Sequence, residues 1–305
     1  MLFKIFMLTK KRKNILITGA NGFVGKALVR ELLKTGDSLF LVSRDEKLKY
    51  PEATGFYGDL TDKKFCRKIV KDIDIVYYLA GFRKNIAVHT GSPFEALSQN
   101  VLPFITFLEA AKISKIKTIV YSSSTHVEYT MSEKEKIDGY VWGKYINELI
   151  LKSFNKETNI EVKTVRYAAI YGPGNDFNPK SSNIIPSLIV KVAEAKDEIT
   201  IWGNGKRLLQ FVYIDDVART LVTVSHSEGN FFVIGNSQNI SVLDLVKKIM
   251  KLMDKKLKIC KDLTKPDKPT KLVVFNSSIK PKVSLEQGLI KTIKDYNKQY
   301  KKSHA

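Results

Sequence analysis

The chain has 305 residues, of which 44% are hydrophobic and 27% charged, so it can build one large or two smaller α/β domains and disorder is not expected. The net charge of +20 would suit a nucleic-acid or membrane partner, but the excess is nearly all lysine spread along the chain, which indicates a solvated surface and argues against nucleic acid. No apolar run approaches a membrane span, and two distant cysteines, with four histidines that lack ligand spacing, predict a cytoplasmic protein without disulfides or metal.

Short apolar runs alternate with helical patterns through the first half of the chain. The first run, NILITG, leads through a glycine turn into a helical pattern at residues 23–36. Buried strands that alternate with helices are typical of βαβ units and of a parallel sheet. Further apolar runs are SLFLVS, DIVYYLAG, KTIVYSSS and VKTVRYAAIYG, and further helices are expected near 62–71, 94–113 and 138–155.

The pattern changes after Gly172, because residues 173–183 are rich in turn formers and indicate a loop. Helices are expected near 184–195, 241–253 and 284–299, while FVYIDDVARTLVTV looks like a return to the first domain. We therefore predict a Rossmann-type doubly wound parallel sheet with a smaller C-terminal α/β substrate lobe. The dinucleotide-binding domain is assigned to 13–172 and 210–235, the substrate-binding lobe to 173–209 and 236–300, and a flexible leader to 1–12.

The glycine turn, TGANGFVG, places Gly19, Gly22 and Gly25 between a strand and a helix. Glycines permit a tight turn and let the backbone approach a pyrophosphate, and the helix N-terminus offers N–H donors. The spacing G-x-x-G-x-x-G differs from the usual Rossmann fingerprint, and a plain turn is the alternative. Its place in the first βαβ unit favours dinucleotide binding.

The end of the second strand should select the cofactor. An acidic residue there would bind the ribose 2′-hydroxyl of NAD, whereas an arginine would accept the 2′-phosphate of NADP. Ser43 and Arg44 stand at this place and favour NADP(H) over NAD(H). The next residue, Asp45, could still serve NAD.

The stretch GYVWGKY carries Tyr140 and Lys144, one helical turn apart. Residues at i and i+4 on a helix are neighbours. An ammonium beside a phenol favours the phenolate and lowers its pKa, which would let a tyrosine exchange protons near neutral pH. A chance pair on a lysine-rich helix is the alternative interpretation.

Seven motifs in order decide between these interpretations: TGANGFVG, YGDL, YYLAG, VYSSS, YVWGK, VRYAAIYGPG and FVYIDDVA. Together they resemble the extended short-chain dehydrogenases/reductases, the group of nucleotide-sugar epimerases, dehydratases and reductases. The resemblance covers roughly residues 13–300. Residues 170–206 also resemble the GDP-fucose synthases, a branch of this group, and this favours a GDP-linked sugar.

The resemblance implies roles for single positions. Tyr140 would be the catalytic acid/base, Lys144 its partner and a ligand of the nicotinamide ribose, and Ser124 the donor to the reacting oxygen. The implied cofactor-binding residues are Gly19, Asn21, Gly22, Phe23, Val24, Gly25, Ser43, Arg44, Asp59, Leu60, Leu79, Ala80, Gly81, Tyr140, Lys144 and Tyr167. The implied substrate-binding residues are Ser124, Thr125, His126, Asn183 and Arg207.

Several positions depart from the resembled pattern. Thr125 and His126 replace the Asp-Glu pair of the dehydratases, so 4,6-dehydration is not expected. His126 could act as an acid or base, or only line the cleft. Asn183 replaces the histidine that protonates carbon in GDP-fucose synthases, which argues against 3,5-epimerisation. Two phosphate contacts are lost at Ala169 and Leu209, and Glu128 replaces a usual tyrosine.

These observations predict an NAD(P)-dependent enzyme, a nucleotide-sugar oxidoreductase that acts at one hydroxyl or ketone, at C4, as a dehydrogenase, 4-reductase or 4-epimerase. One alternative is a reductase or dehydrogenase of a non-nucleotide alcohol or ketone. Another is a non-catalytic nucleic-acid-binding or assembly subunit. A homodimer through the helices near 94–113 and 138–155 is also implied by the resemblance.

Overall fold

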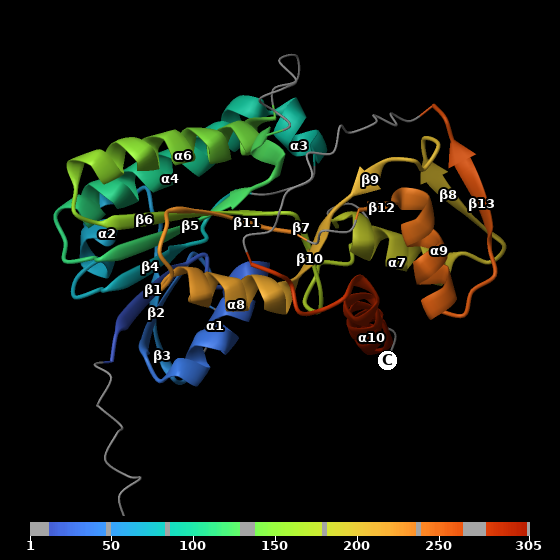
Figure 1. Cartoon of the computed structure of the whole chain (residues 1–305), viewed down its shortest axis with the longest axis horizontal. Helices are drawn as coiled ribbons and strands as arrows, with labels where there is room; N and C mark the ends of the chain where they lie inside the picture. The colour runs from blue at the N-terminus through green and yellow to red at the C-terminus, as the bar shows by residue number, and fades with distance from the viewer. Residues whose placement is uncertain are drawn as a thin grey trace, which may run out of the picture.

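The computed structural model describes residues 12–46, 50–82, 86–128, 138–178, 182–235, 239–264 and 279–303, so nearly all of the expected leader lies outside the described residues. Its centre is a parallel seven-stranded sheet with the strand order β11-β6-β5-β4-β1-β2-β3 (Figure 1). The strands are β1 (Asn14–Thr18), β2 (Ser38–Ser43), β3 (Ala53–Tyr57), β4 (Ile75–Tyr78), β5 (Thr118–Ser124), β6 (Glu161–Tyr167) and β11 (Phe231–Ile234). The predicted Rossmann-type fold is thereby confirmed.

Helices cover both faces of this sheet, which explains why β1, β2 and β4 are mostly apolar. In Figure 1, α6 and α4 lie above the sheet, and α1 and α8 lie below it. Successive strand residues alternate between two cores: Ile15 and Ile17 pack with Leu28 of α1, while Leu16 packs with Phe104 of α4. The helices are α1 (Phe23–Leu32), α2 (Lys63–Ile69), α4 (Pro93–Lys112), α6 (Gly139–Glu157) and α8 (Ile214–Val224), with a short α3 (Ile86–Gly91) before α4.

The strand order reverses between β1 and β4, and ligands of open α/β sheets bind at such a point. The glycine turn that follows β1 fits tightly against the end of β4. Gly19 has φ +66°, and a Cβ on it would lie 2.9 Å from Ala80 N. A Cβ on Gly25 would lie 2.3 Å from Gly19 O. Neither position has room for a side chain, so the turn keeps bare backbone at the reversal point.

The run VKTVRYAAIYG, expected as one strand, forms two. Ala168 N donates to Ile234 O of β11, but Ala169 N donates to Gln210 O, so the chain changes partner between these residues. The second piece, β7 (Ala169–Tyr171), pairs with β10 (Phe211–Tyr213) outside the large sheet. A change of pairing partner leaves no mark on hydropathy, which is why the sequence did not reveal it.

A smaller group of elements packs around a third core beside the sheet (Figure 1). Leu188 and Ile189 of α7, Leu245 of α9 and Leu289 of α10 meet there. The domain boundaries drawn from the sequence stay a prediction. The elements are α7 (Ile184–Glu194), α9 (Val242–Leu252), α10 (Leu285–Ser303) and the strand pairs β8 (Glu198–Trp202) with β13 (Lys258–Asp262) and β9 (Leu208–Leu209) with β12 (Ile240–Ser241).

Within the described ranges, no helix combines the length and the apolar character needed to cross a membrane.

Candidate active site

Tyr140 and Lys144 stand in the first two turns of α6. The helix begins where it does because Asp138 caps it: the Asp138 carboxylate accepts hydrogen bonds from Tyr140 N at 3.0 Å and Val141 N at 3.1 Å. Lys144 Nζ lies 5.8 Å from the centroid of the Tyr140 ring. The helical spacing therefore places the ammonium beside the phenol, as the sequence predicted.

The Lys144 ammonium is buried and held at the end of β5. Its Nζ donates to Ser122 O at 2.7 Å and lies 5.0 Å from the centroid of the Tyr121 ring. Gly81 borders this site, because a Cβ on it would lie 3.0 Å from Asn100 Oδ1 and 3.5 Å from the Lys144 Nζ. An ammonium out of water needs such fixed partners.

The two glycines of GYVWGKY let α6 lie close to α4. A Cβ on Gly139 would lie 2.0 Å from Pro93 O, and a Cβ on Gly143 would lie 2.9 Å from the Asn100 Cβ. Asn147 Nδ2 then donates to Asn100 O at 3.0 Å and to the Tyr121 hydroxyl at 3.2 Å. Close helix packing therefore fixes the depth at which Lys144 meets the sheet.

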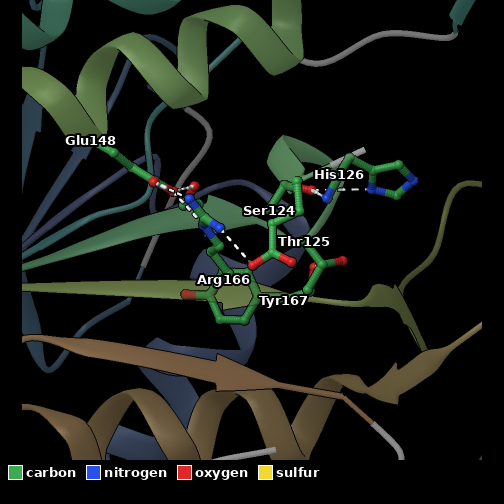
Figure 2. A network of polar contacts seen from close by, with 8 residues as sticks. Ser124, Thr125, His126, Glu148, Arg166 and Tyr167 are labelled. Atoms are coloured by element: carbon green, nitrogen blue, oxygen red, sulfur yellow. Dashed lines mark hydrogen bonds and ion pairs between the residues drawn. The ribbon is translucent and has the colours of Figure 1, made fainter. Parts of the chain in front are cut away.

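Ser124 ends β5, and the turn that follows it is anchored on β6 (Figure 2). Thr125 donates to Tyr167 O from both its backbone N, at 3.0 Å, and its hydroxyl, at 3.1 Å. Ser124 Oγ accepts from His126 N at 3.2 Å and also lies 3.2 Å from His126 Nδ1. Three predicted residues, Ser124, Thr125 and His126, are thus brought together at the carboxyl edge of the sheet.

Beside this turn, Arg166 bridges the carboxylates of Glu148, labelled in Figure 2, and Glu128. Its Nε and Nη2 donate to Glu148 of α6 at 2.9 and 2.5 Å, and its Nη1 donates to Glu128 at 2.9 Å. Ser123 donates to the same Glu148 carboxylate. Burial of Arg166 disfavours its charge, but the bonds and charges of Glu148 and Glu128 outweigh this and raise its pKa. The fork ties α6 to β5, β6 and the turn after Ser124.

The expected cofactor residues gather at the carboxyl ends of β1 to β4. Thr18 Oγ1 accepts from Leu79 N and Ala80 N, both at 3.1 Å, and joins the glycine turn to the end of β4. The first turn of α1 starts at Gly22 with no side-chain cap, which leaves its N–H groups to a ligand. These donors and the bare glycines fit a dinucleotide.

The residues that would meet the far end of a dinucleotide lie at the ends of β2 and β3. The pKa of the Asp59 carboxyl is lowered, chiefly by the hydrogen bond from Thr61 N and further by the charge of Arg44. The Arg44 guanidinium is therefore close enough to Asp59 to stabilise its negative charge. Asp45 N donates to Ser43 Oγ at 3.0 Å. Asn21 Nδ2 lies 3.5 Å from Asp45 Oδ2.

The remaining predicted residues have different surroundings. Leu60 and Tyr167 are buried, and Phe23 and Val24 pack partly against the third core. Asn183 is the N-cap of α7, and Arg207 precedes β9 with its carbonyl accepting from Val242 N at 3.0 Å. Both belong to the smaller group of elements, and their role in substrate binding stays a prediction. Among the described residues, no three His, Cys, Asp or Glu side chains are grouped to hold a metal.

Sequence reasoning missed Glu148, Arg166 and Ser123 as parts of the site. Glu148 lies at i+4 from Lys144, so the spacing contained a usable signal. Arg166 is one of three charged residues on β6, a strand inside the central sheet, and a charge at such a place usually has a partner. His89, on the unpredicted helix α3, contacts Tyr140 and had no sequence signal.

Comparison with known proteins agrees with this geometry. The model of the NAD dependent epimerase/dehydratase family matches residues 15–235, more than half of the chain. A dTDP-4-dehydro-6-deoxy-D-allose reductase from a Streptomyces species is 26% identical over 285 residues, covering 83% of this chain and 85% of the relative. GDP-L-fucose synthase from Escherichia coli K12 is 24% identical over 315 residues, covering 92% and 95%. The structure of UDP-glucose 4-epimerase from Thermotoga maritima superposes with a TM-score of 0.85 at 22% identity, covering 94% and 99%, which shows a common fold.

The Arg166 fork predicts unequal costs for its two carboxylates. Glu148→Ala leaves a buried guanidinium without its main partner and should cost roughly 3–5 kcal/mol of unfolding free energy. Glu128 is 33% exposed against 6% for Glu148, so Glu128→Ala should cost about 1 kcal/mol or less. Urea unfolding of both variants measures this difference, and equal costs would contradict the fork as described.

Proposed function

The chain belongs to the NAD dependent epimerase/dehydratase family, and from this premise we propose that it is a nucleotide-sugar oxidoreductase acting at C4. The observation that carries the proposal is the buried Lys144 ammonium, held by Ser122 O beside the Tyr140 ring at the end of β5. Two relatives support the position on the sugar: the Streptomyces reductase, whose name specifies a 4-dehydro sugar, and a putative UDP-glucose 4-epimerase from Methanocaldococcus jannaschii, 27% identical over 245 residues. The activity is that of a dehydrogenase, a 4-reductase or a 4-epimerase.

The proposed mechanism moves one proton and one hydride. A nicotinamide cofactor, when bound, would supply the hydride chemistry at the sugar carbon. The Tyr140 phenolate takes the proton of the sugar hydroxyl while Ser124 Oγ hydrogen-bonds the same oxygen. The Lys144 ammonium stabilises the negative charge on the phenolate. In the reverse direction the Tyr140 phenol gives this proton to the ketone oxygen, so its protonation state is restored only after oxidation and reduction together.

Chemistry at a single carbon fits the titratable groups in the site. The Thr125 hydroxyl donates a hydrogen bond to Tyr167 O, and a threonine hydroxyl cannot serve as a general acid near neutral pH. Asn183 has no proton to exchange in that range either. His126, 3.2 Å from Ser124 Oγ, is the remaining acid/base candidate, and we propose that it lines the substrate side of the site. These substitutions favour redox at one hydroxyl over dehydration or 3,5-epimerisation.

Two finer assignments complete the proposal. A GDP-linked sugar is favoured, supported by the resemblance of residues 170–206 and by full-length similarity to GDP-L-fucose synthases. NADP(H) is favoured over NAD(H), because Arg44 follows the second strand. Solved structures with bound NAD share this fold at 17–21% identity. At that identity their cofactor does not indicate which cofactor Arg44 selects in this chain.

We also propose a homodimer through α4 and α6. These helices expose the large hydrophobic side chains Leu102, at 57%, and Leu149, at 43%. A two-fold symmetric contact would bury both side chains on both copies.

Tyr140→Phe tests the acid/base role. Removal of the hydroxyl should lower kcat by about 10²- to 10⁴-fold, while cofactor affinity is retained. Tyr145→Phe, on the same helix, is the matched control and should keep its activity. Steady-state rates with NADPH and a nucleotide-linked 4-keto sugar measure both variants. A normal rate in Tyr140→Phe would remove this residue from catalysis.

Arg44→Ala tests the cofactor preference. Loss of one charge-assisted contact to the 2′-phosphate should weaken NADPH about tenfold or more and leave NADH affinity nearly unchanged. Asp45→Asn is the companion variant, which should not weaken NADPH. Fluorescence titration with each nucleotide decides the matter, and an equal loss for both nucleotides in Arg44→Ala would refute the assignment.

Leu102→Glu tests the dimer. A charge in an apolar contact should convert the dimer to a monomer. The control is Ile290→Glu on α10, which is 50% exposed and should remain dimeric. Sedimentation velocity reports the mass, and either a monomeric wild type or a dimeric Leu102→Glu would rule out this interface.

A further inference from the structure

The Tyr140 ring has a second neighbour that the mechanism does not use. His89, on α3, stacks on this ring with centroids 5.1 Å apart and planes inclined by 17°. The histidine is only 5% exposed. Parallel rings at this separation have the offset-stacked arrangement that aromatic pairs prefer. A titratable side chain therefore lies against the phenol that is proposed to move the proton.

One carboxylate connects this histidine to the start of α6. His89 Nδ1 lies 3.9 Å from Asp138 Oδ1, an ion-pair distance and too long for a direct hydrogen bond. The same Asp138 oxygen accepts from Tyr140 N and Val141 N. Asp138 thus fixes the backbone of Tyr140 and also faces the His89 ring, which covers the Tyr140 side chain.

We infer that His89 is a positioning residue for Tyr140. This inference rests on the proposed function, in which Tyr140 is the acid/base. The phenol could swing about its χ1 and χ2 angles, and proton transfer requires its oxygen within hydrogen-bond reach of the substrate. The His89 plane restricts that motion, and Asp138 orients the plane. Lys144 Nζ lies 5.8 Å from the same ring, so its charge acts on a ring that is already held.

A histidine that merely fills the core would affect stability alone. Positioning instead affects the chemical step, because small displacements of a reacting group lower the rate steeply. Three measurements separate the positioning role from the core-filling role. They are kcat at saturating ligands, the melting temperature, and the effect of His89→Ala when the Tyr140 hydroxyl is absent.

The experiment compares His89→Ala with His89→Phe in the full-length chain, using NADPH and a nucleotide-linked 4-keto sugar. His89→Ala removes the stacked ring and should lower kcat roughly tenfold or more, with both KM values changed less than about twofold. His89→Phe keeps a plane of similar size but lacks the nitrogen that faces Asp138, so it should recover part of kcat. Thermal melts accompany both variants, and a full rate in folded His89→Ala, or a His89→Phe as slow as His89→Ala, overturns the inference.

Asp138→Asn provides a second variant that keeps the helix cap, since Asn and Asp are equally good at this position. It removes the charge that faces His89, so kcat should fall while the melting temperature stays the same. An unchanged kcat would show that the carboxylate does not orient His89. This variant keeps the inference testable even if His89→Ala fails to fold.

The double variant Tyr140→Phe/His89→Ala separates this inference from the proposed function. If His89 acts through the Tyr140 hydroxyl, His89→Ala should lower the residual rate of Tyr140→Phe no further. An additive loss overturns the positioning role and leaves the function standing. A normal rate in Tyr140→Phe alone instead refutes the proposed role of Tyr140.

Discussion

The hydrogen bond from the buried Lys144 ammonium to Ser122 O is the interaction on which the candidate site depends. It fixes the distance between α6 and the carboxyl end of β5, which are the two elements that carry the proposed catalytic groups. An ammonium is costly to remove from water, so its surroundings have to be arranged in advance. The Ser122 carbonyl and the close α4–α6 contact at Gly143 provide that arrangement.

A single stripe of α6 makes all of these connections. Tyr140, Lys144, Asn147 and Glu148 recur at intervals of four, three and one, so they face the same side of the helix. Lys144 binds the β5 backbone, Asn147 the Tyr121 hydroxyl, and Glu148 both Ser123 and Arg166. Tyr140 is the first residue of this stripe, one turn before Lys144, whose Nζ is bonded to the β5 backbone. The geometry of the proposed catalytic groups and the packing of α6 are therefore set by the same residues.

Much of this was accessible from the sequence, and the limits have physical causes. The glycine turn, the alternating apolar runs and the i, i+4 pair depend on local chemistry, so they predicted the sheet, the turn and the Tyr140–Lys144 pair. The family resemblance was confirmed by the match over residues 15–235. Contacts between distant segments were missed. His89 contacts Tyr140 from a helix whose sequence has no clear apolar periodicity. β7 pairs outside the large sheet, where Ala169 N donates to Gln210 O.

The most direct test of the central claim is the fate of a labelled hydride. The protein would be mixed with nicotinamide cofactor deuterated at C4 and with 4-keto sugars linked to GDP, dTDP or UDP, and the products examined by mass spectrometry and NMR. The account predicts deuterium at C4 of the sugar, with the GDP-linked substrate converted most efficiently. Bound cofactor with no deuterium transferred to any of these sugars would contradict it.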